Sequence, residues 1–196
     1  MPVAAGLSAW WLDFEHTGPA LPEGPAVIAA NHYSHVDPVL VSLTAQRPIR
    51  YLAVDELYGN SRFFDRVTLW LGAIPVSRTR APLGALKIAL AELSAGGTVG
   101  LFPEGVRVWR WGEVEPKRGA AWLAIRAGVP LVPVALAGTD LVMGRGAGGI
   151  SRSPVVGVRG EPIHPGDFAT HDDPVGAMTA EWRVRVARAL REGYGA

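Results

Sequence analysis

Residues 25–38 read PAVIAANHYSHVDP, an apolar run followed by a polar turn and a proline. The run PAVIAA at 25–30 predicts a buried β-strand, since short apolar segments bounded by turn residues are typical of strands. Pro38 favours the first position of a helix, because proline lacks the N–H group that a helix start leaves unpaired. The stretch therefore predicts a strand, a polar loop and a helix in immediate succession.

The same alternation continues along the chain. Further strands are expected at 50–54, 73–76, 98–102, 131–135 and 154–158. Helices are expected at 39–46, at 63–71, between Pro82 and the Gly96-Gly97 pair, at 119–128 and near the C-terminus. Strands that alternate with helices imply an α/β fold with a largely parallel central sheet flanked by helices. We expect one domain over residues 1–196, with Gly144 to Gly149 as an exposed loop.

The C-terminal helix has two predicted faces. Met178, Trp182, Val186 and Leu190 recur at four-residue steps and define an apolar face. The other faces carry Arg183, Arg188 and Arg191, which are typical of a solvated surface.

Composition excludes several classes of protein. Hydrophobic residues make up 48% of the 196 residues and charged residues 19%, as in chains that fold. Lys and Arg number 19 against 18 Asp and Glu, so bulk charge does not favour a nucleic-acid partner. The absence of cysteine excludes disulfides, thiolate metal sites and a cysteine nucleophile, and it fits a reducing cytosol.

The first 22 residues leave two interpretations. No secretory signal is evident, and no uncharged run reaches the ~20 residues of a membrane span. Trp10 and Trp11 lie beside Leu7 and Leu12. This group predicts either a short helix packed on the domain or an amphipathic segment at a membrane interface, where tryptophan is favoured.

Two histidines and an aspartate follow the first strand. We predict that Asp37 is the N-cap of the helix and that His32 lies in the loop before it. In a loop the two side chains can converge, and a carboxylate on one ring nitrogen leaves the other to accept a proton. Two alternatives remain open at this point: a plain N-cap with surface histidines, and a metal site of His32, His35 and Asp37 like that of a metallo-hydrolase.

Two more polar clusters lie where chemistry gathers in open α/β sheets, in loops beyond strand ends. GAIPVSR at 72–78 places arginine at a turn, and arginine suits bidentate contact with phosphate. FPEGVR at 102–107 places Glu104 and Arg107 in a tight turn. The alternatives are an ordinary surface arginine and an ordinary turn with an internal ion pair.

Together the blocks NH-x4-D, G-x5-R, FPEG-x-R and VPLVPVALAG occur in an order that resembles the glycerolipid acyltransferase family, typified by lysophosphatidate acyltransferases (PlsC-like). His32 and Asp37 match its first block, residues 72–78 its second, 102–105 its third and 129–134 its fourth. Lys117-Arg-Gly119 resembles its basic-glycine element. The resemblance covers residues 26–140 and implies the glycerol-3-phosphate (1)-acyltransferase-like fold.

The resemblance also implies roles. His32 would be a general base, with Asp37 orienting it and His35 spare. Arg78 would hold the phosphate of the acceptor, in a polar pocket shaped by the following residues: Glu104, Gly105, Arg107 and Lys117. The acceptor would be a lysophospholipid, above all 1-acylglycerol-3-phosphate, and the donor acyl-CoA or acyl-carrier protein. Neither a metal nor another cofactor is implied.

Lysophospholipids and long-chain acyl groups partition into bilayers, so we expect a cytoplasmic protein that is peripheral on the inner face of the cell membrane. That expectation favours the membrane-interface interpretation of residues 1–22, since many members of the family carry a hydrophobic anchor there instead.

The chain departs from the family pattern after FPEG. Val106 and Val108 replace the two hydroxyl residues of the common FPEGTRS, and Trp109-Arg110-Trp111 follows. These changes leave a different lipid or a polar headgroup open as acceptor. A lipid-binding module without catalysis is the remaining alternative, which the intact His32/Asp37 pair disfavours.

Overall fold

The computed structural model describes residues 13–54, 74–76 and 83–195. Three predicted features lie outside the described residues: the helix at 63–71, the pair Trp10-Trp11 and, apart from residues 74–76, the Gly72–Arg78 block. The described strands are β1 (Phe14–Thr17), β2 (Ala26–Ala30), β3 (Arg50–Val54), β4 (Ile74–Val76), β5 (Thr98–Leu101), β6 (Leu131–Ala137) and β7 (Val155–Arg159). The described helices are α2 (Asp37–Ala45), α4 (Leu83–Ser94), α5 (Gly119–Ala127), α6 (Thr139–Met143), α7 (Pro174–Gly193) and a 3₁₀ turn, η2 (Pro165–Phe168).

The strands form one sheet in the order β1-β7-β6-β2-β5-β3-β4. Neighbours from β6 through β2, β5 and β3 to β4 are parallel, as are β1 and β7. The exception is the pair β6 and β7, which is antiparallel. The prediction of an α/β fold with a largely parallel central sheet is confirmed, and the two strands at one edge, β1 and β7, run opposite to the other five.

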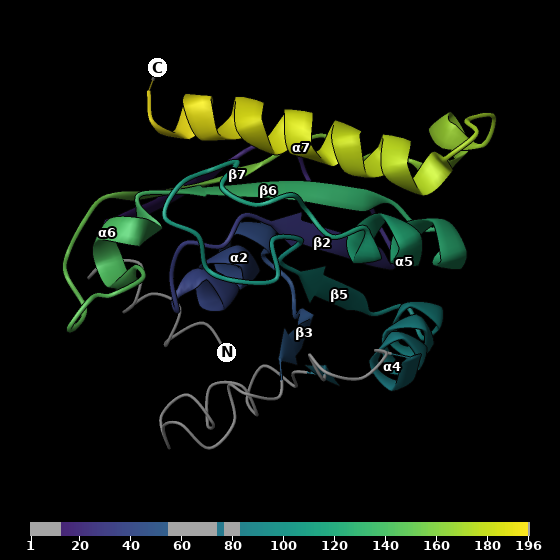
Figure 1. Ribbon diagram of the computed structural model, residues 1–196, viewed down its shortest axis with the longest axis horizontal. Coiled ribbons are helices and arrows are strands. Elements are labelled where there is room, and N and C mark those ends of the chain that lie inside the picture. Colours follow the sequence, from purple (N-terminus) through teal and green to yellow (C-terminus); the bar gives the residue numbers. More distant parts are fainter. Residues whose placement is uncertain (1–12, 55–73, 77–82, 196) are drawn as a thin grey trace.

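Helices cover both faces of the sheet, with α7 and α5 on one side and α2 on the other (Figure 1). Successive residues of β2 point to opposite faces, as strand geometry requires. Val27 and Ala29 join the core beneath α5 and α7, whereas Ile28 joins the core beneath α2. This double coverage explains why the strand is apolar throughout rather than alternating.

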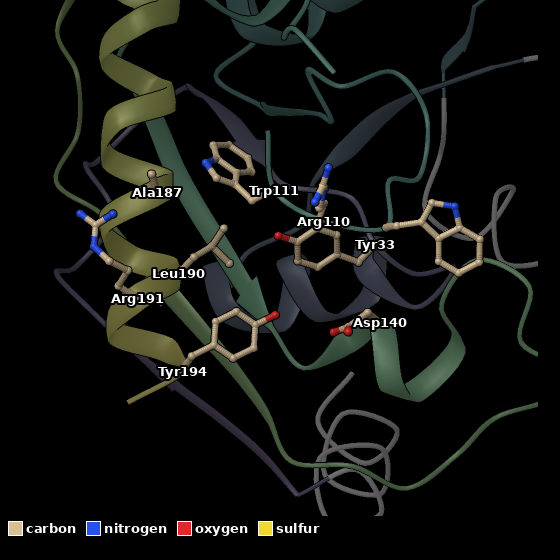
Figure 2. A pocket seen from close by; sticks show the side chains of 9 residues that line it. Tyr33, Arg110, Trp111, Asp140, Ala187, Leu190, Arg191 and Tyr194 are labelled. Atoms are coloured by element: carbon tan, nitrogen blue, oxygen red, sulfur yellow. The ribbon is translucent and has the colours of Figure 1, made fainter. Parts of the chain in front are cut away.

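The C-terminal helix packs as its pattern predicts. Met178, Trp182, Val186 and Leu190 are each 5% exposed or less. The Trp182 indole N–H also donates to the Ala29 carbonyl oxygen at 2.9 Å, which joins α7 to the central strand. The C-terminal part of α7 borders a cavity of about 450 Å³ (Figure 2).

Helix α4 packs through most of its leucine pattern, whose three- and four-residue steps are typical of a helix. Leu93 is buried, and Leu86 and Leu90 pack partly buried against the core, whereas Leu83 is 65% exposed. The helix ends at Ser94, just before Gly96, whose φ is +85°, and the Gly97 N–H donates to the Glu92 carbonyl oxygen at 2.9 Å. Glycine is favoured there because other residues adopt positive φ at a cost.

The N-terminal segment is only partly described. Residues 14–17 form β1, which pairs with β7 at the edge of the sheet. The membrane-interface prediction therefore now concerns residues 1–12, which lie outside the described residues. Within the described part of the chain, no helix is both long enough and apolar enough to cross a membrane.

Candidate active site

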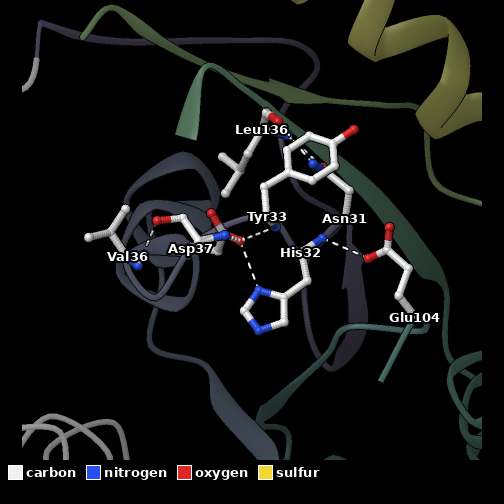
Figure 3. Close-up of polar contacts among 8 residues, drawn as sticks. Asn31, His32, Tyr33, Val36, Asp37, Glu104 and Leu136 are labelled. Atoms are coloured by element: carbon white, nitrogen blue, oxygen red, sulfur yellow. Dashed lines mark hydrogen bonds and ion pairs between the residues drawn. The ribbon is translucent and has the colours of Figure 1, made fainter. Parts of the chain in front are cut away.

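Two of the three predicted clusters meet at one edge of the sheet. Strands β2 and β5 are parallel neighbours, and Ala29 pairs with Leu101 near their carboxyl ends. The β2–α2 loop (residues 31–36) and the FPEG turn therefore emerge side by side. The backbone N–H of His32 donates to Glu104 Oε2 at 2.7 Å, which ties the two segments together (Figure 3).

Asn31 anchors the β2–α2 loop. It is fully buried, and its side-chain amide donates to the Leu136 carbonyl oxygen at 2.9 Å. The same side chain accepts from the Leu136 N–H at 2.8 Å (Figure 3). The amide thus continues the pairing of β2 with β6 by one position. The Asn in the NH-x4-D block was a signal for this role that sequence reasoning did not use.

The imidazole of His32 and the carboxylate of Asp37 form the centre of the site. His32 Nδ1 lies 2.8 Å from Asp37 Oδ2. The same oxygen accepts from the backbone N–H groups of Tyr33 and Ser34, each at 2.7 Å (Figure 3). Three N–H groups thereby offset the cost of burying the carboxylate. Because a carboxylate only accepts, Nδ1 carries the proton and Nε2 is left as an acceptor.

The predicted N-cap is wrong. Asp37 is the first residue of α2, the N-cap is Val36 with φ −82° and ψ −12°, and Pro38 is the second helical residue. The carboxylate turns back to the loop because the free N–H groups of Tyr33 and Ser34 lie there. Asp37 is fully buried and accepts from Tyr33 and Ser34 in the loop rather than capping α2, so the alternative of a plain N-cap is wrong as well.

Aromatic stacking holds the other side of the imidazole. The His32 ring stacks on Phe102, with centroids 4.1 Å apart, and Phe102 stacks in turn on Tyr51 at 5.8 Å. The side chain of His32 remains 18% exposed. The ring is therefore fixed by Asp37 and Phe102 and still reachable from solvent. Sequence reasoning missed Tyr51, which sits on another strand and carries no local signal.

Glu104 is buried beneath this loop and is 5% exposed. Burial raises its pKa to about 8, against a smaller lowering by the hydrogen bond from His32. The carboxyl is therefore mostly protonated at neutral pH. No ion pair joins Glu104 to Arg107 among the described residues, so the internal ion pair of the ordinary-turn alternative is not found.

Gly105 and Lys117 lie against each other. Gly105 has a φ of +69°, and a Cβ built on it would lie 2.7 Å from Lys117 Nζ. The Lys117 N–H also donates to the Pro103 carbonyl oxygen at 2.7 Å. Glycine at 105 thus permits both the turn and the close approach of an ammonium group.

Arg107 adds positive charge to the same edge. It is half-buried, and burial lowers its pKa. Burial lowers the pKa of His35 as well, with a further lowering by the charge of Arg107. The structure thus brings Glu104, Gly105, Arg107 and Lys117 to the His32 edge, whereas Arg78 lies outside the described residues.

The metal alternative finds no ligand group here. Among the residues that the structure describes, no three His, Cys, Asp or Glu side chains gather in a group suited to a metal ion. His32 Nδ1 is already engaged by Asp37.

Comparison with known proteins decides the family. Residues 13–137 match the family model described as Acyltransferase, which is well over half of the chain. The chain belongs to the acyltransferase family. The resemblance inferred from the four sequence blocks is thereby confirmed, and the matched range contains β2, β5, β6 and both described clusters.

Named relatives agree with this assignment. The 1-acyl-sn-glycerol-3-phosphate acyltransferase of Bacillus subtilis is 30% identical over 163 residues, or 82% of this chain and 78% of the relative. The chloroplastic enzyme BAT2 of Brassica napus, which has the same activity name, is 31% identical over 133 residues, 64% of this chain and 37% of the relative. These names confirm the prediction that the protein is an O-acyltransferase.

One solved structure shows the same fold. It is the crystal structure of PlsC, the 1-acyl-sn-glycerophosphate (LPA) acyltransferase of Thermotoga maritima, with a TM-score of 0.71 and 22% identity. The likeness covers 94% of this chain and 76% of that one. The fold prediction, an acyltransferase-type α/β domain, is confirmed.

Proposed function

We propose that the protein transfers a fatty acyl group from a thioester donor to the free hydroxyl of 1-acylglycerol-3-phosphate, giving phosphatidate. The activity shared by the names of its relatives supports this acceptor. The observation that carries the chemistry is the 2.8 Å contact between His32 Nδ1 and the buried Asp37 carboxylate, which leaves Nε2 as the acceptor of a proton.

In the proposed reaction, His32 Nε2 removes the proton of the acceptor hydroxyl as its oxygen attacks the thioester carbonyl carbon. The new ester bond forms and the carbon–sulfur bond breaks. The departing thiolate takes the proton from the imidazolium, so the enzyme returns to its starting state. Asp37 stays ionised and stabilises the imidazolium, as in a serine-protease relay in which the substrate supplies the nucleophile. General-base assistance of this kind contributes ~10² to 10⁴ in rate.

The acceptor phosphate is assigned to the cationic side chains. We assign its main contact to Arg78, because a guanidinium can bind phosphate through two hydrogen bonds. Arg107 and Lys117 add positive charge near His32, while Glu104 and Gly105 shape the turn that positions them. The proposed chemistry requires neither a metal ion nor another cofactor, since the thioester is itself activated.

We further propose that the protein works on the cytoplasmic face of the cell membrane, bound peripherally through residues 1–12. The support is chemical, since lysophospholipid and long-chain thioester both partition into bilayers, and tryptophan favours the interface.

The test is acyl transfer from a long-chain acyl thioester to lysophosphatidate in vesicles, followed by mass spectrometry of the phosphatidate formed. His32→Ala should lower kcat by about 10² or more. His35→Ala is the matched control, because it removes the same side chain from the same loop and should leave activity within a few-fold. Equal rates for His32→Ala and wild type would refute the base assignment.

The same assay separates the alternatives. A lipid-binding module would bind vesicles without turnover on any lysolipid or polar acceptor. A metallo-hydrolase would lose activity on treatment with a chelator, and its metal would appear in elemental analysis of the purified protein. An acceptor other than lysophosphatidate would appear as the preferred product in an acceptor screen.

A further inference from the structure

The cavity beside α7 is the feature that the proposed reaction leaves unexplained. It holds about 450 Å³ and lies between α7, α6 and the WRW segment, defined as Trp109, Arg110 and Trp111 (Figure 2). Four aromatic side chains line it: Tyr33, Trp109, Trp111 and Tyr194. The WRW segment follows the FPEG turn, where the chain departs from the common FPEGTRS pattern.

The cavity also carries positive charge. Arg110 and Arg191 line it together with Asp140. Among the described residues, no ion pair joins either arginine to an acidic side chain. Arg145 lies 5.6 Å from the centre of the Trp109 ring, but it pairs with Glu113 at 3.8 Å. Aromatic ring faces and the guanidinium groups of Arg110 and Arg191 thus occur in one recess.

Part of the wall is held in place before any ligand arrives. Trp111 packs edge-on against the buried Trp182, with ring centroids 5.5 Å apart. Tyr33 is 4% exposed. A preformed aromatic wall binds with a smaller loss of side-chain entropy than a mobile one.

The position of the cavity relative to His32 limits which part of a substrate can bind in it. Tyr33 lines the cavity and directly follows His32, yet its ring and the imidazole point to opposite sides of the loop (Figure 3). The Val108 N–H donates to the His32 carbonyl oxygen at 2.8 Å, which fixes the start of the WRW segment against the same loop. A group in the cavity is therefore near the reaction site but separate from the reacting bond.

Two substrate parts are unsuitable for this position. The phosphate of lysophosphatidate lies only a few bonds from the hydroxyl that reacts, so it must stay on the imidazole side of the loop. A fatty acyl chain begins at the reacting carbonyl and would match only the aromatic and aliphatic part of the lining, because it has no polar group for Arg110, Asp140 or Arg191.

We propose that the cavity binds the adenine nucleotide of an acyl-CoA donor. This inference rests on the proposed acyl transfer and selects CoA over a carrier protein, whose thioester arm carries no nucleotide. An adenine ring stacks on aromatic side chains, and arginine binds phosphate through paired hydrogen bonds. The flexible pantetheine arm then reaches around the loop and presents the thioester to His32. Asp140 accepts hydrogen bonds from the adenine amino group or the ribose.

The kinetic test compares two donors with the same thioester, palmitoyl-CoA and palmitoyl-pantetheine. In the variant Arg110→Ala/Arg191→Ala, KM for palmitoyl-CoA should rise roughly tenfold or more, because charged hydrogen bonds to phosphate are lost. KM for palmitoyl-pantetheine and kcat with either donor should not change. Arg188→Ala is the matched control, since this arginine lies on the same helix and pairs with Glu192 at the surface.

A binding test does not depend on turnover. Adenosine 3′,5′-bisphosphate should bind wild type and His32→Ala alike in calorimetry, and the double arginine variant about tenfold more weakly or not at all. Binding by a protein that shows no acyl transfer would support the cavity and refute the proposed function. Equal KM changes for both donors, an unchanged KM for palmitoyl-CoA, or no binding of the bisphosphate to wild type would overturn the proposal.

Discussion

The β2–α2 loop and the WRW segment touch through the hydrogen bond from Val108 N–H to the His32 carbonyl, but they are built in different ways. The loop is largely buried and is held by two sets of hydrogen bonds: those that the Asn31 side chain makes with Leu136, and those that the Asp37 carboxylate accepts from the backbone of Tyr33 and Ser34. In the WRW segment Trp109 is 60% exposed and Arg110 is exposed, whereas Trp111 is half-buried against Trp182. Proton transfer requires a base fixed to a fraction of an ångström, whereas stacking and charge tolerate small displacements. The difference predicts that substitutions in the loop damage folding or chemistry, and those in the segment damage binding alone.

The largest effect should come from Asp37→Asn. The amide has nearly the same shape, but it lacks the negative charge that stabilises the imidazolium and sets the His32 tautomer. We expect kcat to fall by about 10² to 10⁴, measured by acyl transfer at saturating donor. Asp172→Asn, at an exposed position, serves as the control. A loss of less than a few-fold for Asp37→Asn would show that the pair is structural.

Asn31→Ala should have the next largest effect, on stability. Removing the side chain leaves the buried N–H and C=O of Leu136 without partners, at about 1–3 kcal/mol for each group. The free energy of unfolding in urea should therefore fall by about 2–6 kcal/mol. Thr170→Ala, at an exposed turn, should change it by less than about 0.5 kcal/mol. A similar small change for Asn31→Ala would remove the contrast between loop and segment.

Glu104 predicts a pH dependence of stability. Its pKa is about 8 when folded and near 4.5 when unfolded, so the folded state binds the proton more tightly. Between these values the unfolded chain is ionised and the folded one protonated, so stability falls as pH rises from about 4.5 to 8. Below that window the group has no effect, and above it the loss is complete.

Glu104→Gln tests this sign. The amide keeps an acceptor for the His32 N–H and cannot ionise, so the variant should be more stable than wild type at pH 8, by an amount on the order of a few kcal/mol. Urea unfolding at pH 5 and pH 8 measures the difference, which should nearly vanish at the lower pH. Parallel pH profiles for the two proteins would contradict the burial of an ionisable group.

The smallest effect should come from Trp109→Ala. Because the ring is largely exposed, we expect the free energy of unfolding to change by less than about 0.5 kcal/mol. Thermal unfolding would detect this directly. A fall of more than about 1 kcal/mol in the free energy of unfolding would mean that the WRW segment stabilises the fold, as the β2–α2 loop does.

Much of the fold was predictable because it depends on local patterns. The four-residue spacing from Met178 to Leu190 predicted the buried face of α7, and the apolar run before Asn31 predicted β2. The reversal of β7 had no such signal, because an apolar strand has the same composition in either direction. The leucine pattern of α4 predicted the helix and most of its packed face, but not the exposure of Leu83, since only the tertiary structure shows where the neighbouring elements end.

The candidate site, too, was predicted in part from the sequence. His32, Asp37 and the FPEG turn were identified from residue types and spacing, and strand adjacency explains why they meet. The backbone N–H groups of Tyr33 and Ser34 that donate to Asp37 were not predicted, because every non-proline residue has such a group and the sequence does not show where it points. The stacking of His32 on Phe102, and of Phe102 on Tyr51, was not predicted either, because the three residues come from different parts of the sheet.

The sequence by itself determined the alternation of strands and helices from β2 to β7, the chemical groups available and the family to which they belong, but it did not predict β1 or α6. Backbone geometry sets those patterns over a few residues at a time. Only the tertiary structure decided that Arg191, predicted as a solvated surface residue, shares a cavity with Tyr33 and the WRW segment. Contacts such as Trp182 with Ala29, 153 residues apart, depend on packing of the whole sheet, and no local pattern encodes them.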